Sequence, residues 1–199
     1  MTDYLKEILE WTVLGLNVVF LFLIIKEIIW CWPFGILASA ISVFLFIDAS
    51  LFSETLLYSV YVILGVYAWI NWHKNSKKTP MPILVKQRKY HLVTIIIGGA
   101  LWLMLGYFFD TFTSSKLPWA DAATTSFAFV ATYLEAKKIL HHWVYWILVN
   151  AFSVWLYHTR ELKIMAVMMI GFTIFSIVGY IIWKQRFRNQ ELIKPDVLL

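Results

Sequence analysis

Two tryptophans and an asparagine lie on one face of a predicted helix in the last third of the chain. Trp143, Trp146 and Asn150 are spaced by three and then four residues, which on an α-helix places their side chains within roughly 40° of a common line. Indole rings stack on flat ring systems, and a carboxamide both donates and accepts hydrogen bonds. This face favours binding of a planar small molecule with polar edges. The alternative is helix–helix packing with the asparagine as a polar contact.

The composition indicates that this helix lies in a membrane. Of the 199 residues, 61% are hydrophobic and 18% are aromatic, whereas soluble domains contain about 45–50% apolar residues. The mean hydropathy is +0.72, and the apolar residues form runs long enough to cross a hydrocarbon layer of about 30 Å. The period-two alternation of a transmembrane β-barrel is not seen in the sequence. We therefore predict an all-α membrane protein.

Seven apolar runs are predicted to be transmembrane helices. Their approximate ranges are 11–25, 30–47, 53–72, 91–109, 119–136, 143–158 and 164–183. Lysine and arginine are enriched in cytoplasmic loops, and alternate sides of this arrangement hold thirteen and four of them. The sequence thus predicts an external N-terminus and a cytoplasmic C-terminus. Because these loop residues explain the net charge of +5, we expect no nucleic-acid partner.

The polar residues do not form a pattern typical of catalysis or metal binding. His141 and His142 are adjacent, so they project in different directions and suit positions near the membrane interface better than a shared metal ion. Glu135 is near the end of its predicted helix, and we expect it to pair with Lys137 or Lys138. Serine, histidine and acidic residues occur without the spacing of a nucleophile elbow or a metal site. We expect no enzymatic activity, no cofactor and no metal.

An internal repeat relates the two ends of the chain at a shift of 111 residues. The matched pairs include Lys26 with Lys137, Trp32 with Trp143, Ala40 with Ala151, Ser42 with Ser153 and Leu45 with Leu156. At the same shift Ser39 falls on Asn150, whereas Tyr67 falls on Tyr180 only if two residues are inserted. The first three predicted helices therefore correspond to the last three.

The single helix between the two triplets lets both insert in the same direction. We therefore predict a 3+1+3 arrangement of parallel repeats, as in SWEET-type transporters. The expected parts are a first three-helix bundle (1–72), a basic loop with a linker helix (73–117), a second three-helix bundle (118–184) and a cytoplasmic tail (185–199).

Four segments carry a resemblance to a known family: 32–36 (WPFGI), 67–69 (YAW), 121–125 (DAATT), and 137–150 with its W-x-x-W-x-x-x-N pattern. They resemble the PnuC vitamin transporters, which are similar in fold to SWEETs and in which that last pattern lines the substrate site. The resemblance implies facilitated diffusion (uniport) of nicotinamide riboside or a closely related vitamin, which is trapped inside the cell by phosphorylation. It also implies a multi-pass protein of the bacterial plasma (inner) membrane, in contact with membrane lipid and assembled as a homotrimer.

One departure from the family concerns the third helix. Nicotinamide riboside transporters of this family carry a glutamine and an asparagine where this sequence has Tyr58 and Gly65. A ring and a gap at these positions favour a different or larger aromatic group, so thiamine is the alternative substrate and riboflavin a third candidate. A membrane receptor without transport is the alternative of another class. The predicted substrate-binding residues are Trp143, Trp146, Asn150, Tyr58, Tyr61, Trp32 and Ser39.

Overall fold

The computed structural model describes residues 3–49, 52–76, 81–113 and 115–193, which fold almost entirely into helices. In chain order these are α1 (Asp3–Ile25), α2 (Cys31–Asp48), α3 (Phe52–Asn75), α4 (Arg88–Phe112), α5 (Pro118–Ala136), α6 (His142–Thr159) and α7 (Lys163–Ile193). Extended structure in the described ranges is limited to an isolated parallel bridge between Leu84 and Ile139. The predicted all-α fold class and the number of helices are confirmed.

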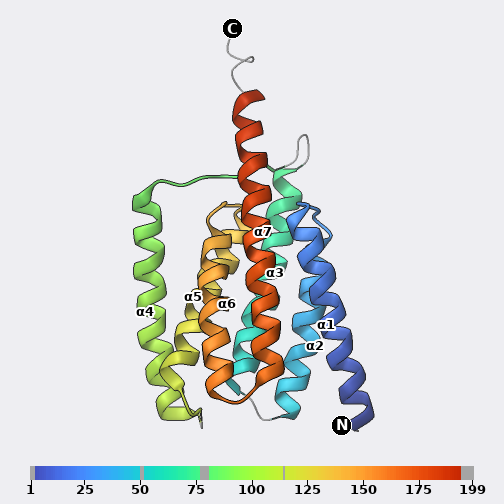
Figure 1. Cartoon of the computed structure of the whole chain (residues 1–199), viewed down its shortest axis with the longest axis vertical. Helices are drawn as coiled ribbons and strands as arrows, with labels where there is room; N and C mark the ends of the chain where they lie inside the picture. Colours follow the sequence, from blue (N-terminus) through green and yellow to red (C-terminus); the bar gives the residue numbers. More distant parts are fainter. Residues whose placement is uncertain (1–2, 50–51, 77–80, 114, 194–199) are drawn as a thin grey trace. The chain divides into compact units, whose positions relative to one another are not determined.

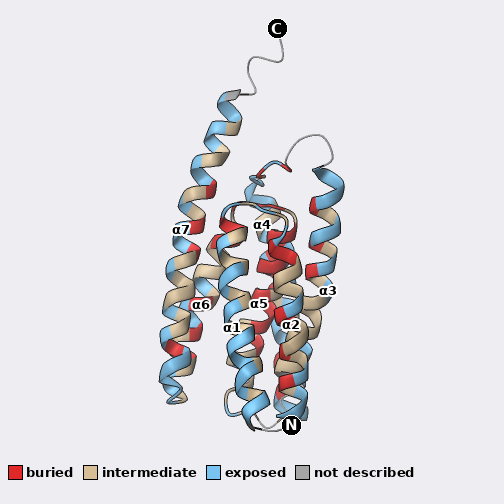
Figure 2. Cartoon of the chain, turned by 90° about the vertical axis from the view of Figure 1, so that its right-hand side faces the viewer, coloured by how far each residue is buried: buried red, intermediate tan, exposed pale blue. Residues whose placement is uncertain are grey.

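Five helices, α1 to α4 and α7, are long and apolar enough to cross a membrane. α5 and α6 are more polar, and many of their polar side chains face inward: Thr125, Ser126, Thr132 and Glu135 of α5 are buried. Figure 2 shows this contrast between α5, which carries much of the buried surface, and α1, which is largely exposed. Exposed apolar side chains on α1 are expected where a helix faces lipid rather than water.

Two helix ends differ most from those predicted. α1 begins at Asp3 rather than at residue 11, and α7 continues from residue 183, where its apolar run stops, to Ile193. The prediction used the ends of the apolar runs, but the flanking residues are mostly good helix formers and extend both helices. The first part of the predicted cytoplasmic tail is therefore helical. Within it, the side-chain oxygen of Gln190 accepts a hydrogen bond from the amide of Ile83 at 3.2 Å.

The chain forms two compact units, divided between residues 79 and 80. In the first unit, α2 packs against both α1 and α3. In the second unit, α5 packs against α4 and α6, and α6 packs against α7 (Figure 1). α4, predicted as part of a separate linker, thus packs with the second bundle.

The turn before α2 and the turn before α6 have the same structure. Glu27 and Lys138, which are equivalent at the shift of 111, have φ angles of 62° and 57°. A left-handed residue of this kind is a common helix end. In each turn the following amide donates to the carbonyl five residues earlier, Ile28 to Leu23 and Ile139 to Leu134, both at 3.0 Å. These bonds define the same helix-ending motif, known as the Schellman motif, in both units.

The buried faces of α2 and α6 also correspond. The two helices begin and end at equivalent residues. Their equivalent buried pairs are Cys31 with His142, Trp32 with Trp143, Ser39 with Asn150, Ser42 with Ser153 and Leu45 with Leu156. The internal similarity seen in the sequence is thus present in the local structure of each unit.

Candidate substrate-binding site

Trp143 is buried in the second unit, with 2% of its surface exposed. Its ring covers Gly179 of α7, where a Cβ atom would lie 2.6 Å from the nearest ring carbons. The ring also makes an edge contact with Trp183, at 5.6 Å between centroids and 87° between planes. Trp143 is therefore part of the contact between α6 and α7, and in this conformation its ring is not an open stacking surface.

The first unit contains the same aromatic pair. Trp32, also 2% exposed, meets Trp72 of α3 at 5.6 Å and 82°. Trp72 and Trp183 are equivalent at the shift of 111. The indole Nε1 atoms of Trp32 and Trp143 are both buried, and neither has a hydrogen-bond partner within the described ranges. The match of Trp72 with Trp183 shows that the shift of 111 still holds in the last turns of α3. The two-residue insertion that was needed to align Tyr67 with Tyr180 is not needed to align these tryptophans.

Trp146 contacts α5 instead of α7. Its Nε1 donates a hydrogen bond to Oε2 of Glu135 at 2.9 Å, and its ring is partly exposed. Glu135 is only 3% exposed, and it accepts from this indole where pairing with a neighbouring lysine was predicted. Lys138 instead donates to the carbonyl of Met81 at 2.6 Å. A buried acid is a candidate for function, because burial of a carboxyl group in a membrane protein is costly.

Asn150 joins α6 to α7 through a hydroxyl group. It is 8% exposed, and its Nδ2 donates to Oγ of Ser176 at 3.4 Å. The Ser176 hydroxyl in turn donates to the carbonyl of Phe172 at 2.8 Å. At the shift of 111 the equivalent residues of the first unit are Ser39 and Gly65. The amide–hydroxyl pair is therefore specific to the second unit.

Tyr58 and Tyr61 lie together on α3 and are partly buried. Their rings meet edge to face at 5.6 Å, and Tyr58 also packs on Phe46 of α2 at 5.1 Å. Gly65 was predicted to leave a gap beside them, and this prediction is wrong. A Cβ atom at Gly65 would lie 2.8 Å from Cγ1 of Ile36, so the close packing of α2 on α3 fills the volume with the isoleucine side chain.

The three predicted site residues of α6 thus face two different helices. Trp143 and Asn150 contact α7, and Trp146 contacts α5. The other predicted residues, Trp32, Ser39, Tyr58 and Tyr61, belong to the first unit. The second unit brings two pairs of groups together along α6. The partly exposed indole of Trp146 meets the buried carboxyl group of Glu135 on α5, and one turn further the amide of Asn150 meets the hydroxyl of Ser176 on α7. These groups can stack on a flat ring, offset a positive charge and bind a polar edge.

Comparison with known proteins shows the family. The family model of nicotinamide mononucleotide transporters, the PnuC family, matches residues 7–185. The chain belongs to the PnuC family. The crystal structure of the vitamin B3 transporter PnuC has the same fold, with a TM-score of 0.67 and 19% sequence identity over 95% of this chain and 94% of that chain. No curated protein matches the sequence. As predicted, the protein is a multi-pass membrane transporter and not an enzyme.

The adjacent histidines of this PnuC-family chain have separate environments. His142 is fully buried, with Nδ1 2.9 Å from the carbonyl of Ile139. His141 precedes α6 and faces His91 of α4, with 4.5 Å between ring centroids. Burial first, and then the neighbouring His91, lower the pKa of His141 below its usual range. The described ranges contain no cluster of three side chains suited to a metal ion.

Two partners of the predicted residues were missed in the sequence, Glu135 and Ser176. The internal repeat contained a signal for the first of them. At the shift of 111, Glu135 and Trp146 correspond to Ile24 and Gly35. Glu135 and Trp146 thus occur together in the second repeat of this PnuC-family chain, and both are absent from the first. This pattern indicates a contacting pair with a role that the first repeat does not share.

Proposed function

We propose that this PnuC-family transporter carries nicotinamide riboside or a closely related vitamin by facilitated diffusion, as a uniporter. The observation that carries the proposal is the bond between Trp146 and Glu135, with Asn150 one turn further along α6. Nicotinamide riboside has a flat, positively charged pyridinium ring and a carboxamide. An indole attracts a cationic ring, a carboxyl group offsets its charge, and the asparagine amide can bond the carboxamide. Phosphorylation inside the cell would then trap the vitamin.

We assign direct contact with the vitamin to Trp146 and Asn150. Trp143 would hold α6 against α7, and its ring would become accessible only if α7 moved away from α6 at Gly179. In the first bundle, the residues that we propose as substrate-binding are Trp32, Ser39, Tyr58 and Tyr61. Binding must be moderate, because a carrier that holds its substrate too tightly releases it slowly.

We further propose that α1–α3 and α5–α7 are parallel repeats on either side of α4, the 3+1+3 arrangement of SWEET-type transporters. The matching turns at Glu27 and Lys138 and the matching Trp32–Trp72 and Trp143–Trp183 contacts support this proposal. In such a carrier the two bundles rock about a central site. The loop charges favour an external N-terminus in a bacterial inner membrane, and the family resemblance favours a homotrimer.

Thiamine is the alternative substrate. Tyr58 and Gly65 stand where nicotinamide riboside transporters of this family carry two amides, and here Tyr58 packs on Phe46 while the Ile36 side chain occupies the space beside Gly65. An apolar aromatic wall suits the methylated rings of thiamine better than it suits a carboxamide. The thiazolium ring of thiamine is also a cation, so Glu135 fits both vitamins. Riboflavin, which is uncharged, remains a third candidate.

Purified protein in sealed liposomes tests these proposals. Labelled nicotinamide riboside or thiamine is added outside without an ion gradient, and we expect saturable uptake that stops at equal concentrations inside and outside. Enclosing the matching vitamin kinase with ATP should then raise the retained label. Accumulation above equilibrium without the kinase would overturn uniport, and binding without flux would indicate a receptor. Uptake of thiamine but not of nicotinamide riboside would select the alternative substrate.

A further inference from the structure

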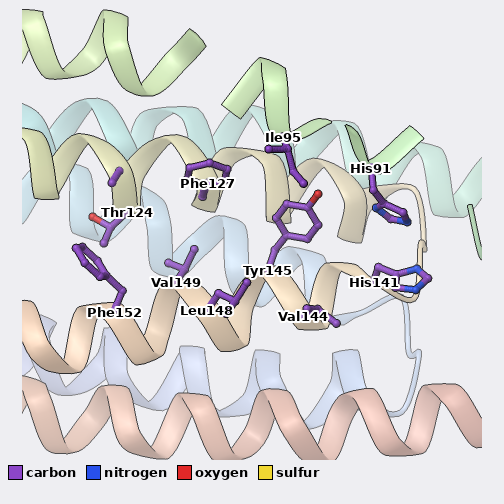
Figure 3. A pocket seen from close by; sticks show the side chains of 11 residues that line it. His91, Ile95, Thr124, Phe127, His141, Val144, Tyr145, Leu148, Val149 and Phe152 are labelled. Atoms are coloured by element: carbon purple, nitrogen blue, oxygen red, sulfur yellow. The ribbon is translucent and has the colours of Figure 1, made fainter. Parts of the chain in front are cut away.

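A groove of about 470 Å³ lies between α4, α5 and α6, entirely within the second unit. Its walls are apolar along most of its length, as Figure 3 shows for Ile95, Phe127, Leu148 and Phe152. Leu148 and Phe152 are also strongly exposed. A water-soluble vitamin would find little to bond along these walls. The groove is therefore distinct in chemistry from the proposed vitamin site around Trp146.

One end of the groove is polar. The imidazoles of His91 and His141 meet there, while Thr124 and Phe152 lie at the other end (Figure 3). Nε2 of His91 and Nδ1 of His141 are both buried, and neither has a hydrogen-bond partner within the described ranges. Buried polar atoms are normally paired, and a rotation of either partly exposed ring would turn an N–H into the groove, where an occupant with a hydrogen-bonding head and an apolar tail would pair it. The nearby hydroxyl of Tyr145 is already bonded, to Thr94 at 2.8 Å.

The length of the groove fits one leaflet of a membrane. His141 and Phe152 are eleven residues apart along α6, which corresponds to about 16 Å at about 1.5 Å per residue. Half of a hydrocarbon layer of about 30 Å has nearly the same thickness. An acyl chain that runs along α6 from the histidine end would reach the middle of the membrane.

The charges near the histidine end favour an anionic head group. Arg88 and Lys89 begin α4 one turn before His91, and Lys137 ends α5 just before the turn to His141. The nearest acid in the sequence, Glu135, is buried against Trp146 on α5. Basic residues close to a membrane surface attract anionic lipids, and imidazole N–H groups donate to phosphate oxygens.

We propose that this groove binds an anionic phospholipid, with the phosphate at His91 and His141 and one acyl chain along α6. The lipid supplies hydrogen-bond partners for both ring nitrogens and covers the exposed apolar wall. Neither the vitamin nor its transport is needed for this site, so the proposal stands independently of the function proposed above.

Native mass spectrometry of the full chain released from nanodiscs tests the proposal. The nanodiscs contain equal parts of phosphatidylcholine and phosphatidylglycerol. We expect one retained lipid per chain, with a preference for phosphatidylglycerol of roughly fivefold. His91→Phe with His141→Phe should abolish the preference, and His158→Phe at the exposed end of α6 serves as the matched control. Equal retention of both lipids by the wild type would overturn the head-group assignment.

A second pair of variants tests the acyl-chain position. Ala123→Trp places a large ring in the groove and should abolish retention of either lipid, whereas Ala151→Trp, on an exposed position of α6 outside the groove, should not. Retention by Ala123→Trp equal to that of the control would overturn the proposal. So would disulfide cross-linking of Leu148→Cys between two copies without bound lipid, because the groove would then be an interface between copies.

A label on the wild-type chain provides a readout that does not depend on the folding of any variant. Phosphatidylglycerol with a photoactivatable acyl chain should label peptides containing Phe127 or residues 144–152. Labelling confined to α1 or α3 would contradict the proposed site.

Discussion

Replacement of Gly179 by alanine tests whether α7 covers the ring of Trp143. The added methyl group would lie 2.6 Å from ring carbons, about 1 Å closer than carbon atoms ordinarily approach. Because an indole ring is rigid, either the ring or α7 has to move. Overpacking of this kind costs about 1–3 kcal/mol, whereas replacing glycine by alanine within a helix gains about 1 kcal/mol. The net free energy of unfolding should fall or stay nearly unchanged.

Gly171→Ala is the matched control, because it is in the same helix and a Cβ atom there meets nothing within 4 Å. It should show only the gain in helix propensity. The two variants should therefore differ by about 1–3 kcal/mol, the cost of overpacking alone. At about 2–4 °C per kcal/mol for a chain of this size, Gly179→Ala should melt clearly below Gly171→Ala. Thermal unfolding in detergent, followed by tryptophan fluorescence, measures the difference.

Equal melting temperatures would refute this reasoning. They would mean that the Trp143 ring is not held against Gly179 and is free to turn toward a ligand. The stacking platform predicted from sequence spacing would then stand in its original form, with Trp143 and Trp146 both in contact with the vitamin.

The remaining predictions concern three buried polar side chains. Glu135→Gln keeps an oxygen for the Trp146 indole but removes the charge, so uptake of a cationic vitamin should fall by about tenfold or more with little change in melting temperature; unchanged uptake would exclude a role for the charge. Asn150→Ala should abolish uptake in proteoliposomes while the protein still inserts into membranes, whereas Ser153→Ala, whose hydroxyl bonds only within α6, should transport normally. Equal uptake by these two variants would remove Asn150 from the site. Lys138→Met removes the buried ammonium group that donates to the carbonyl of Met81 and should lower the free energy of unfolding by about 1–3 kcal/mol, measured by thermal unfolding; a wild-type melting temperature would contradict this.

The helical fold could be predicted because a membrane imposes a length on each apolar run. The ends of α1 and α7 could not be predicted in the same way, since residues 3–10 and 184–193 mix charged and apolar helix formers and lie beyond the continuous apolar runs. The hydrogen bond from Ile83 to Gln190 further supports the extended end of α7. Such a contact joins residues far apart in the chain and leaves no local pattern.

The candidate site could be predicted only in part, for a similar reason. Spacing on α6 predicted that Trp143, Trp146 and Asn150 share one face, but it carried no information about the helices they meet: Trp143 and Asn150 contact α7, whereas Trp146 contacts α5. The gap predicted at Gly65 failed because a glycine marks either open space or close approach of a neighbour, and here Ile36 is the neighbour. The internal repeat was the better guide, since it related Trp32 to Trp143 before any contact was known.

The bond between Glu135 and Trp146 has a consequence for the way a vitamin would be oriented. A carrier built from two identical halves would offer a small molecule two equivalent poses, turned end for end. In this chain the equivalent residues of the first repeat are Ile24 and Gly35, which provide neither charge nor ring. On the proposed arrangement, the cationic end of the vitamin therefore has one preferred direction, and the carrier distinguishes head from tail throughout its cycle.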